Sequence, residues 1–208
     1  MITKESLELV QKITQKIPSF HHHYHILYDI SNVIKKETIN YVEIGAYAGA
    51  SATLMLHNPK VNVISIDIGT PVKQEDVYKN ISIFFDCTDK KRFYYIEGSS
   101  HLEETKLKLL NKIKEIDIIF IDGDHSYDSV IKDFEMYSDL VSENGYIIFD
   151  DYHCDVCTQV RPSVDFIVSN LKTNQFEVIG SLPNTFDAHP EYFKSNNCFV
   201  LRKNEKSI

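Results

Sequence analysis

The sequence lacks the features that mark membrane, secreted and nucleic-acid-binding proteins. No apolar run in its 208 residues approaches the length that crosses a bilayer. The N-terminus, Met1-Ile-Thr-Lys4, has neither the basic start nor the apolar core of a signal peptide. The net charge is −8, and no basic stripe with interleaved aromatic residues occurs. Because basic contacts to phosphate supply most nucleic-acid affinity, we expect a cytoplasmic protein with a small-molecule partner, and neither a nucleic acid nor a membrane.

Cysteine is also scarce, being confined to Cys87, Cys154, Cys157 and Cys198. Thiols stay reduced in the cytosol, and a chain of this length buries a sizeable core without disulfides. Cys154 and Cys157 form a Cys-x-x-Cys pair, but no second pair of ligands stands at the spacing of a structural zinc site. A loop with two thiols is therefore the preferred interpretation, with a metal or redox role as the alternative.

No internal repeat, low-complexity tract or linker divides the chain, and its length fits a compact core. We expect an N-terminal helical segment over residues 1–37, an α/β domain over residues 38–203 and a tail over residues 204–208. The first segment should hold two helices, one ending before Pro18 and one beginning near Ile26. The histidines of the intervening cluster His21–His25 are interpreted as surface or packing residues, with contact to a substrate or metal as the alternative.

Short apolar runs alternate with helical patterns from Thr38 onward. We expect strands at Ile39–Ile44, Asn62–Asp67, Arg92–Ile96, Ile118–Ile121, Tyr146–Phe149, Phe176–Ile179 and Cys198–Leu201. Helices are expected at Ala52–Leu56, Leu102–Ile113, Ser126–Leu140 and after Pro162. This order predicts an α/β, Rossmann-like fold with a seven-stranded, mostly parallel sheet, an antiparallel last strand and helices on both faces.

Two of the expected strands end in carboxylates. Asp122 follows the fourth strand, and Asp150 and Asp151 follow the fifth. A right-handed crossover between the two strands places all three acids at the carboxyl edge of the sheet, where α/β proteins bind ligands. Clustered carboxylates repel one another, and a hard divalent cation is the simplest resolution. Asp117 and Asp128, by contrast, are interpreted as solvated surface acids.

A glycine turn, Gly45-Ala-Tyr-Ala-Gly49, joins the first strand to a helix, as in nucleotide-binding folds. Asp67 closes the second strand at the spacing where such folds bind ribose hydroxyls. The turn lacks the Gly-x-Gly-x-x-Gly pattern of dinucleotide sites, and Glu43 beside it would repel a diphosphate. A cationic ligand suits Glu43 better, which favours S-adenosylmethionine because it carries an ammonium and a sulfonium but no phosphate.

Four motifs carry a family resemblance. Val42-Glu-Ile-Gly-Ala-Tyr-Ala-Gly-Ala-Ser51 resembles the first motif of class I S-adenosylmethionine-dependent methyltransferases, and is especially similar to that of catechol and related small-molecule O-methyltransferases. Gly98-Ser-Ser-His101 resembles their adenine-side motif. Ile121-Asp-Gly-Asp-His125 and Phe149-Asp-Asp-Tyr152 resemble the metal motifs of cation-dependent members, including those that methylate sugars of macrolides and aminocoumarins.

The resemblance implies a role for each matching residue. The residues expected to contact S-adenosylmethionine are Glu43, Gly45, Ala46, Tyr47, Gly49, Ser51, Asp67, Gly98, Ser99, Ser100, His101 and Asp122. Asp122, Asp150 and Asp151 are expected to bind Mg²⁺ or another divalent cation. His125 is the expected general base, and Asp124 is the alternative. The implied reaction is methyl transfer to a hydroxyl of a small acceptor such as a sugar or a phenol.

Two other functions stay open on the sequence alone. One is a metal-dependent hydroxylation, because a few proteins resembling this family are associated with hydroxylation in antibiotic pathways. The other is a non-catalytic domain that binds S-adenosylmethionine or acts as a scaffold. No diagnostic pattern occurs before Thr38 or after Arg161, so the sequence leaves the acceptor open, together with assembly into a homo-oligomer.

Overall fold

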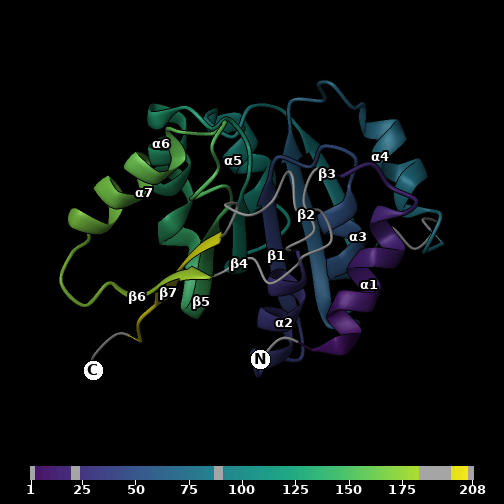
Figure 1. Ribbon diagram of the computed structural model, residues 1–208, viewed down its shortest axis with the longest axis horizontal. Coiled ribbons are helices and arrows are strands. Elements are labelled where there is room, and N and C mark those ends of the chain that lie inside the picture. The colour runs from purple at the N-terminus through teal and green to yellow at the C-terminus, as the bar shows by residue number, and fades with distance from the viewer. Residues whose placement is uncertain (1–2, 20–23, 87–90, 183–197, 206–208) are drawn as a thin grey trace.

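The computed structural model describes residues 3–19, 24–86, 91–182 and 198–205. At its centre lies a seven-stranded sheet in the order β3-β2-β1-β4-β5-β7-β6 (Figure 1). The strands are β1 (Ile39–Ile44), β2 (Val61–Asp67), β3 (Phe93–Glu97), β4 (Ile116–Ile121), β5 (Val141–Phe149), β6 (Phe176–Leu182) and β7 (Cys198–Lys203). Strands β1 to β5 pair in parallel, whereas β7 runs antiparallel to both β5 and β6. The predicted sheet, including its antiparallel last strand, is confirmed.

Helices cover both faces of the sheet, as predicted (Figure 1). The helices are α1 (Lys4–Thr14), α2 (His25–Val33), α3 (Ala50–Leu56), α4 (Gln74–Ile81), α5 (Glu103–Leu110), α6 (Tyr127–Tyr137), the 3-10 turn η1 (Ser138–Leu140) and α7 (Val160–Ser169). Buried side chains of α1 to α4 form one core with the first face, and those of α5 to α7 form a second core with the other. In the part of the chain that the structure describes, no helix is long and apolar enough to cross a bilayer.

The central strands carry apolar side chains on both faces of the sheet. In β4, Ile118 and Phe120 belong to the first core, while Ile119 and Ile121 belong to the second. All six residues of this strand are buried. Such a strand is stable only between two layers of helices, which is why it lies in the middle of the sheet.

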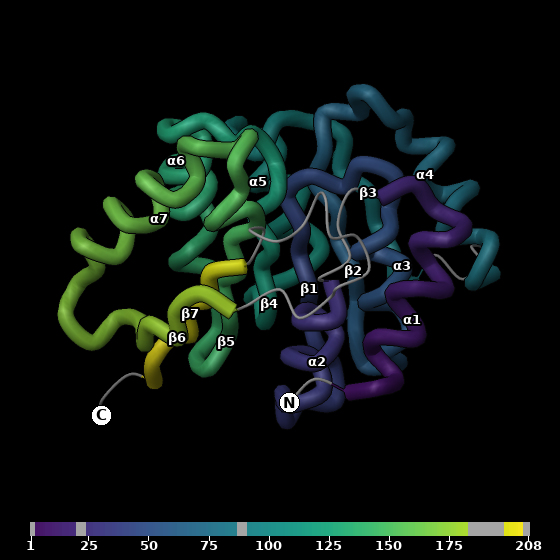
Figure 2. Tube along the Cα trace, in the orientation of Figure 1, coloured from purple at the N-terminus to yellow at the C-terminus, as the bar shows by residue number. Residues whose placement is uncertain are grey.

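The N-terminal segment packs against α3 on the first face, and the tube trace shows α1 running alongside α3 (Figure 2). The predicted helix that ends before Pro18 is confirmed as α1, and Thr3 caps its start by accepting a hydrogen bond from the backbone of Ser6. His25 is fully buried at the start of α2, whereas His21 to His23 lie outside the described residues. Helix α4 was not predicted, because Val77 and Ile81 are its only buried residues.

The interpretation of Asp117 as a surface acid is wrong. Its side chain is only 2% exposed and accepts hydrogen bonds from Lys36 Nζ, from the backbone N of Asn40 at 2.8 Å and from Ser142 Oγ at 2.8 Å. The acid therefore connects the segment before β1 to β4 and β5, at the end of the sheet opposite the carboxylate cluster. Asp128 is exposed, as expected.

We expect Asp117→Ala to lower the free energy of unfolding by about 2 kcal/mol, because it removes hydrogen bonds to a buried charged group. Urea unfolding monitored by circular dichroism measures this change. Asp128→Ala is the matched control and should change stability by less than about 0.5 kcal/mol. Equal effects of the two substitutions would contradict a structural role for Asp117.

Candidate functional site

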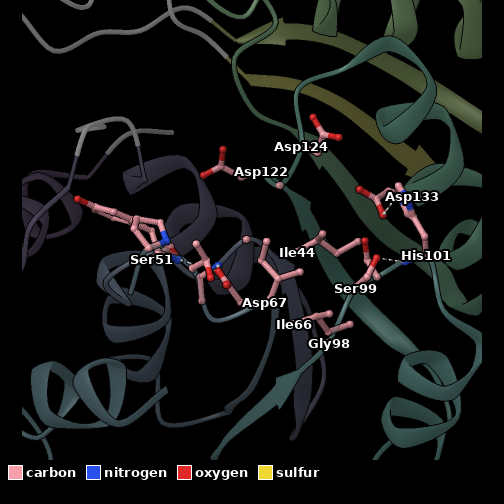
Figure 3. A pocket seen from close by; sticks show the side chains of 18 of the residues that line it. Ile44, Ser51, Ile66, Asp67, Gly98, Ser99, His101, Asp122, Asp124 and Asp133 are labelled. Carbon is pink, nitrogen blue, oxygen red and sulfur yellow. Dashed lines mark hydrogen bonds and ion pairs between the residues drawn. The ribbon is translucent and has the colours of Figure 1, made fainter. Parts of the chain in front are cut away.

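A cleft of about 430 Å³ opens at the carboxyl edge of the sheet, above β1, β2 and β4 (Figure 3). Its walls come from the turns after β1, β2, β3 and β4, and from Tyr24 of the N-terminal segment. The volume is in the range of small-molecule sites. The cleft lies at the edge at which α/β sheets bind ligands, which is where the sequence predicts the site.

The turn after β1 depends on a glycine. Gly45 has φ +90°, and a Cβ at this position would lie 2.0 Å from the backbone oxygen of Asp122. The amide of Gly45 donates to Ile66 O at 2.9 Å, and the amide of Asp122 donates to Ile44 O at 2.9 Å. These contacts fix the ends of β1, β2 and β4 against one another, because only glycine permits so close a backbone approach.

Asp67 at the end of β2 lines the cleft and is held by backbone amides. Its carboxylate accepts from Ala46 N at 2.8 Å, Tyr47 N at 3.2 Å and Gly69 N at 2.7 Å. A carboxylate has about four acceptor sites, so capacity remains for a ligand hydroxyl. Tyr47 also lines the cleft and has a positive φ of 43°. The position of Asp67 fits its predicted contact with a ribose.

Glu43 lies beneath the cleft, outside the residues that line it. It is fully buried and accepts from Tyr41 Oη at 2.9 Å, Ser51 Oγ at 2.7 Å and Ser65 Oγ at 2.6 Å. Burial raises the pKa of Glu43 from 4.5 to about 7, although these three hydrogen bonds oppose the shift. Because Ser51 lines the cleft and donates to Glu43, its hydroxyl connects the buried carboxyl group to the cleft.

The turn after β3 forms the opposite wall, where His101 lies beside Asp133 of α6 (Figure 3). His101 Nε2 lies 3.2 Å from Asp133 Oδ1, and the amide of His101 donates to Ser99 Oγ at 3.3 Å. Tyr137 Oη donates to the backbone oxygen of Ser100 at 2.7 Å. Asp133 and Tyr137, both on α6, therefore hold the Gly98–His101 motif that was predicted to contact the adenine.

Asp133 was missed by the sequence reasoning, although it lines the cleft. It is 1% exposed, and burial raises the pKa of its carboxyl group. The signal was present, because Asp133 falls between Val130 and Tyr137 on the apolar face of α6, where an acid needs a partner.

The three predicted metal ligands come together at the rim of the cleft. One carboxylate oxygen from each of Asp122, Asp150 and Asp151 lies within 4.8 Å of the others. Asp150 and Asp151 are 1% and 2% exposed, and Asp151 has a strained φ of 56°. The parallel pairing of Ile121 with Phe149 causes the convergence, because the acids follow directly. An all-oxygen, triply acidic set matches the ligands that Mg²⁺ and Ca²⁺ prefer.

His125 adjoins this cluster, whereas Asp124 does not. The Nε2 atom of His125 lies 3.3 Å from both Asp122 Oδ1 and Asp151 Oδ2. The exposed carboxylate of Asp124 accepts from Ser129 Oγ at 2.7 Å and from the amide of Ser126 at 3.0 Å. These hydrogen bonds, that of Ser129 foremost, lower the pKa of Asp124 and make it the weaker candidate for a base.

Tyr24 is a further lining residue that the sequence reasoning missed. Its ring packs edge to face against that of Phe120, with 6.2 Å between the ring centroids. Its hydroxyl oxygen accepts a hydrogen bond from Ser19 Oγ at 3.3 Å. Burial, together with the negative charges of Asp122 and Asp150, raises the pKa of Tyr24. Its phenol therefore stays protonated beside the acids. No pattern in the sequence marked it, because its position depends on the packing of the N-terminal segment.

Two thiols also contact the acids. Cys157 Sγ donates to Asp151 Oδ2 at 3.3 Å, and the buried Cys198 Sγ donates to Asp150 Oδ1 at 3.6 Å. Burial and the neighbouring carboxylates raise the pKa of both thiols. Cys157 is therefore not only a loop residue, because its side chain contacts Asp151 of the carboxylate cluster.

Residues 42–152 match the family model described as a methyltransferase domain. The chain belongs to this family, and its fold is that of the class I methyltransferases, which use S-adenosylmethionine. An uncharacterized protein of Acanthamoeba polyphaga mimivirus is 37% identical over 204 residues, covering 90% of this chain and 90% of that protein.

Solved structures show the same fold. The O-methyltransferase of Bacillus cereus in complex with SAH aligns with a TM-score of 0.64 at 16% identity, covering 98% of this chain and 92% of that chain. An rRNA methylase of Streptococcus thermophilus aligns with a TM-score of 0.60 at 14% identity, covering 88% of this chain and 97% of that chain. At these identities the likeness concerns the fold, so the acceptor must be argued from the site.

The raised pKa of Glu43 predicts a pH-dependent stability. The folded protein holds the Glu43 proton up to about pH 7, whereas the unfolded chain releases it near pH 4.5. The stability that this proton contributes is therefore lost as the pH rises between those values. Relative to the wild type, Glu43→Gln should gain stability over this window, by roughly 3 kcal/mol at its end. Urea unfolding of both proteins across the window measures the difference, and a difference that does not vary with pH would contradict the assignment.

Proposed function

We propose that the protein transfers the methyl group of S-adenosylmethionine to a hydroxyl of a small acceptor, with a divalent cation such as Mg²⁺ held by Asp122, Asp150 and Asp151. The observation that carries this proposal is the convergence of these carboxylates within 4.8 Å at the rim of the cleft. His125 adjoins them at 3.3 Å. The similar Bacillus cereus O-methyltransferase with bound SAH supports both the donor and the reaction class.

In this proposal the donor lies along the cleft, with its adenine at the turn after β3 and its methionine portion at the turn after β1. Asp67 accepts the ribose hydroxyls, and Ser99, Ser100 and His101 lie on the side proposed for the adenine. The turn from Gly45 to Gly49 then faces the methionine portion, where Glu43 and Ser51 supply negative polarity for the ammonium. This orientation brings the sulfonium and its methyl group toward Asp122, on the side of the carboxylate cluster.

A bound divalent cation would supply Lewis acidity at this rim, because it lowers the pKa of a coordinated hydroxyl. The protein's own residues complete the reaction. His125 Nε2 takes the proton of the acceptor hydroxyl as the general base. The oxygen lone pair then forms a bond to the methyl carbon, and the electrons of the carbon–sulfur bond return to sulfur. Holding the two reactants in line supplies much of the rate enhancement.

The site favours a small acceptor over a nucleic acid. The net charge of the chain is −8, and acids line the rim at which the acceptor would enter. A phosphate backbone would be repelled there unless basic residues compensated for it. Tyr24 places an aromatic face and a protonated hydroxyl on the acceptor side of the cleft, which suits a phenol or a sugar.

We expect Asp150→Asn to abolish the stimulation of turnover by Mg²⁺, with a loss on the order of 100-fold, because a neutral amide binds a hard cation poorly. A methyl-transfer screen over catechols, sugar diols and an rRNA fragment, with and without Mg²⁺, measures the effect. Asp155→Asn, at an exposed acid of the following loop, is the matched control. Turnover that is equally metal-stimulated in Asp150→Asn would reject the metal role, and transfer to the RNA alone would reject the small acceptor.

We expect His125→Ala to lower kcat by about 100-fold or more while S-adenosylmethionine still binds, because the residue acts on the acceptor. Calorimetric titration with the donor checks binding in the wild type and the variant. A wild type that does not bind the donor would refute the proposed function as a whole. An unchanged kcat in His125→Ala, with the donor bound, would refute only the assignment of the base.

A further inference from the structure

A second set of metal-ligating atoms overlaps the carboxylate cluster. One ring nitrogen of His125, one carboxylate oxygen of Asp151 and Sγ of Cys157 all lie within 4.8 Å of one another. We propose that this set binds a borderline transition-metal ion, Zn²⁺ in particular, at a site that shares Asp151 with the carboxylates but differs from them in chemistry.

The spacing of the three atoms suits a tetrahedral ion. Asp151 Oδ2 lies 3.3 Å from His125 Nε2 and 3.3 Å from Cys157 Sγ. Ligands at zinc distances of about 2.0 to 2.3 Å stand about 3.3 to 3.6 Å apart around a tetrahedral centre. The observed separations from Asp151 therefore need little adjustment, and the fourth position is left for water.

Two consecutive turns present the thiol to Asp151. The amide of Cys154 donates to Asp151 O at 3.0 Å, and the amide of Cys157 donates to Cys154 Sγ at 3.3 Å. Cys154 therefore orders the backbone, while Cys157 supplies the ligand. His125 and Cys157 are only partly buried, so an ion can reach them from solvent.

The chemistry of the three ligand atoms determines which metal ion binds. Imidazole and thiolate favour Zn²⁺ and related transition metals, whereas Mg²⁺ prefers oxygen ligands. On binding, the ion replaces the thiol proton of Cys157, which is released to solvent. Asp122 and Asp150 contribute no ligand to this second set, so the loops after β4 and β5 together offer two ions two different environments.

The two environments exclude each other, a consequence that rests on the proposed function. An ion at the second set draws Asp151 away from the carboxylates and occupies the Nε2 atom with which His125 would accept the hydroxyl proton. Zn²⁺ should therefore inhibit Mg²⁺-stimulated methyl transfer. The binding itself is independent of catalysis and can be tested without it.

Co²⁺ is the probe for binding, because thiolate ligation gives a sulfur-to-cobalt charge-transfer absorption that oxygen ligation does not give. Under reducing conditions we expect this absorption in the wild-type protein and in the matched control Cys154→Ser, with its removal on addition of Zn²⁺. Cys157→Ser should lose it, and His125→Gln should weaken Co²⁺ binding on the order of 100-fold. Cys157→Ala serves as a second variant, and circular dichroism verifies that each variant is folded.

The absence of the absorption in the wild type, or its persistence in folded Cys157→Ser or Cys157→Ala, would overturn the proposal. Its loss in Cys154→Ser would also overturn it, because the ion would then be held by the Cys-x-x-Cys pair. None of these outcomes depends on turnover. A protein that fails to methylate any acceptor but shows the absorption only when Cys157 is present would refute the proposed function and leave the second site standing.

Discussion

The close approach of Gly45 to the backbone of Asp122 is the constraint on which the site depends. A Cβ atom at position 45 would lie 2.0 Å from the backbone oxygen of Asp122. The turn after β1 and the start of the loop after β4 can therefore pack together only if residue 45 is glycine. The first of these segments faces the proposed donor, and the second begins the carboxylate cluster. One backbone contact thus fixes the distance between the turn proposed to face the donor and the carboxylate cluster, and a displacement reaction requires such fixed positioning.

The acidic side chains of this site lie at two depths relative to the protein surface. Asp122, Asp150 and Asp151 meet at the rim, whereas Glu43 is fully buried beneath the turn. Three hydroxyl groups donate hydrogen bonds to Glu43, while its burial raises its pKa to about 7. The rim acids receive a histidine and two thiols as neighbours instead. This difference agrees with the proposed function, in which the deep acid faces the organic donor and the rim acids hold a metal ion.

Much of the fold could be predicted from the sequence, because the buried strands are short runs of apolar residues and their order dictates the parallel sheet. The carboxylate cluster could be predicted for the same reason, since strand ends share one edge. Asp117 and Tyr24 could not, because their partners come from distant segments, and for Asp133 the sequence indicated burial but not the partner. Asp117 contacts Lys36 and Ser142, Asp133 contacts His101, and Tyr24 contacts Phe120. Local patterns report which face of an element is apolar, but they do not report which polar residue finds a partner there.

The insertion of β7 between β5 and β6 has a consequence for how the molecule is made. A ribosome delivers β5 long before Cys198–Lys203 emerges, and until then the apolar β5 is an open edge of the sheet. An unpaired edge of this kind invites pairing with other nascent chains. The strand that closes the sheet is therefore made well after β5, and it also brings Cys198 into contact with Asp150. Completion of the rim and protection from aggregation are thus achieved in the same late step of biosynthesis.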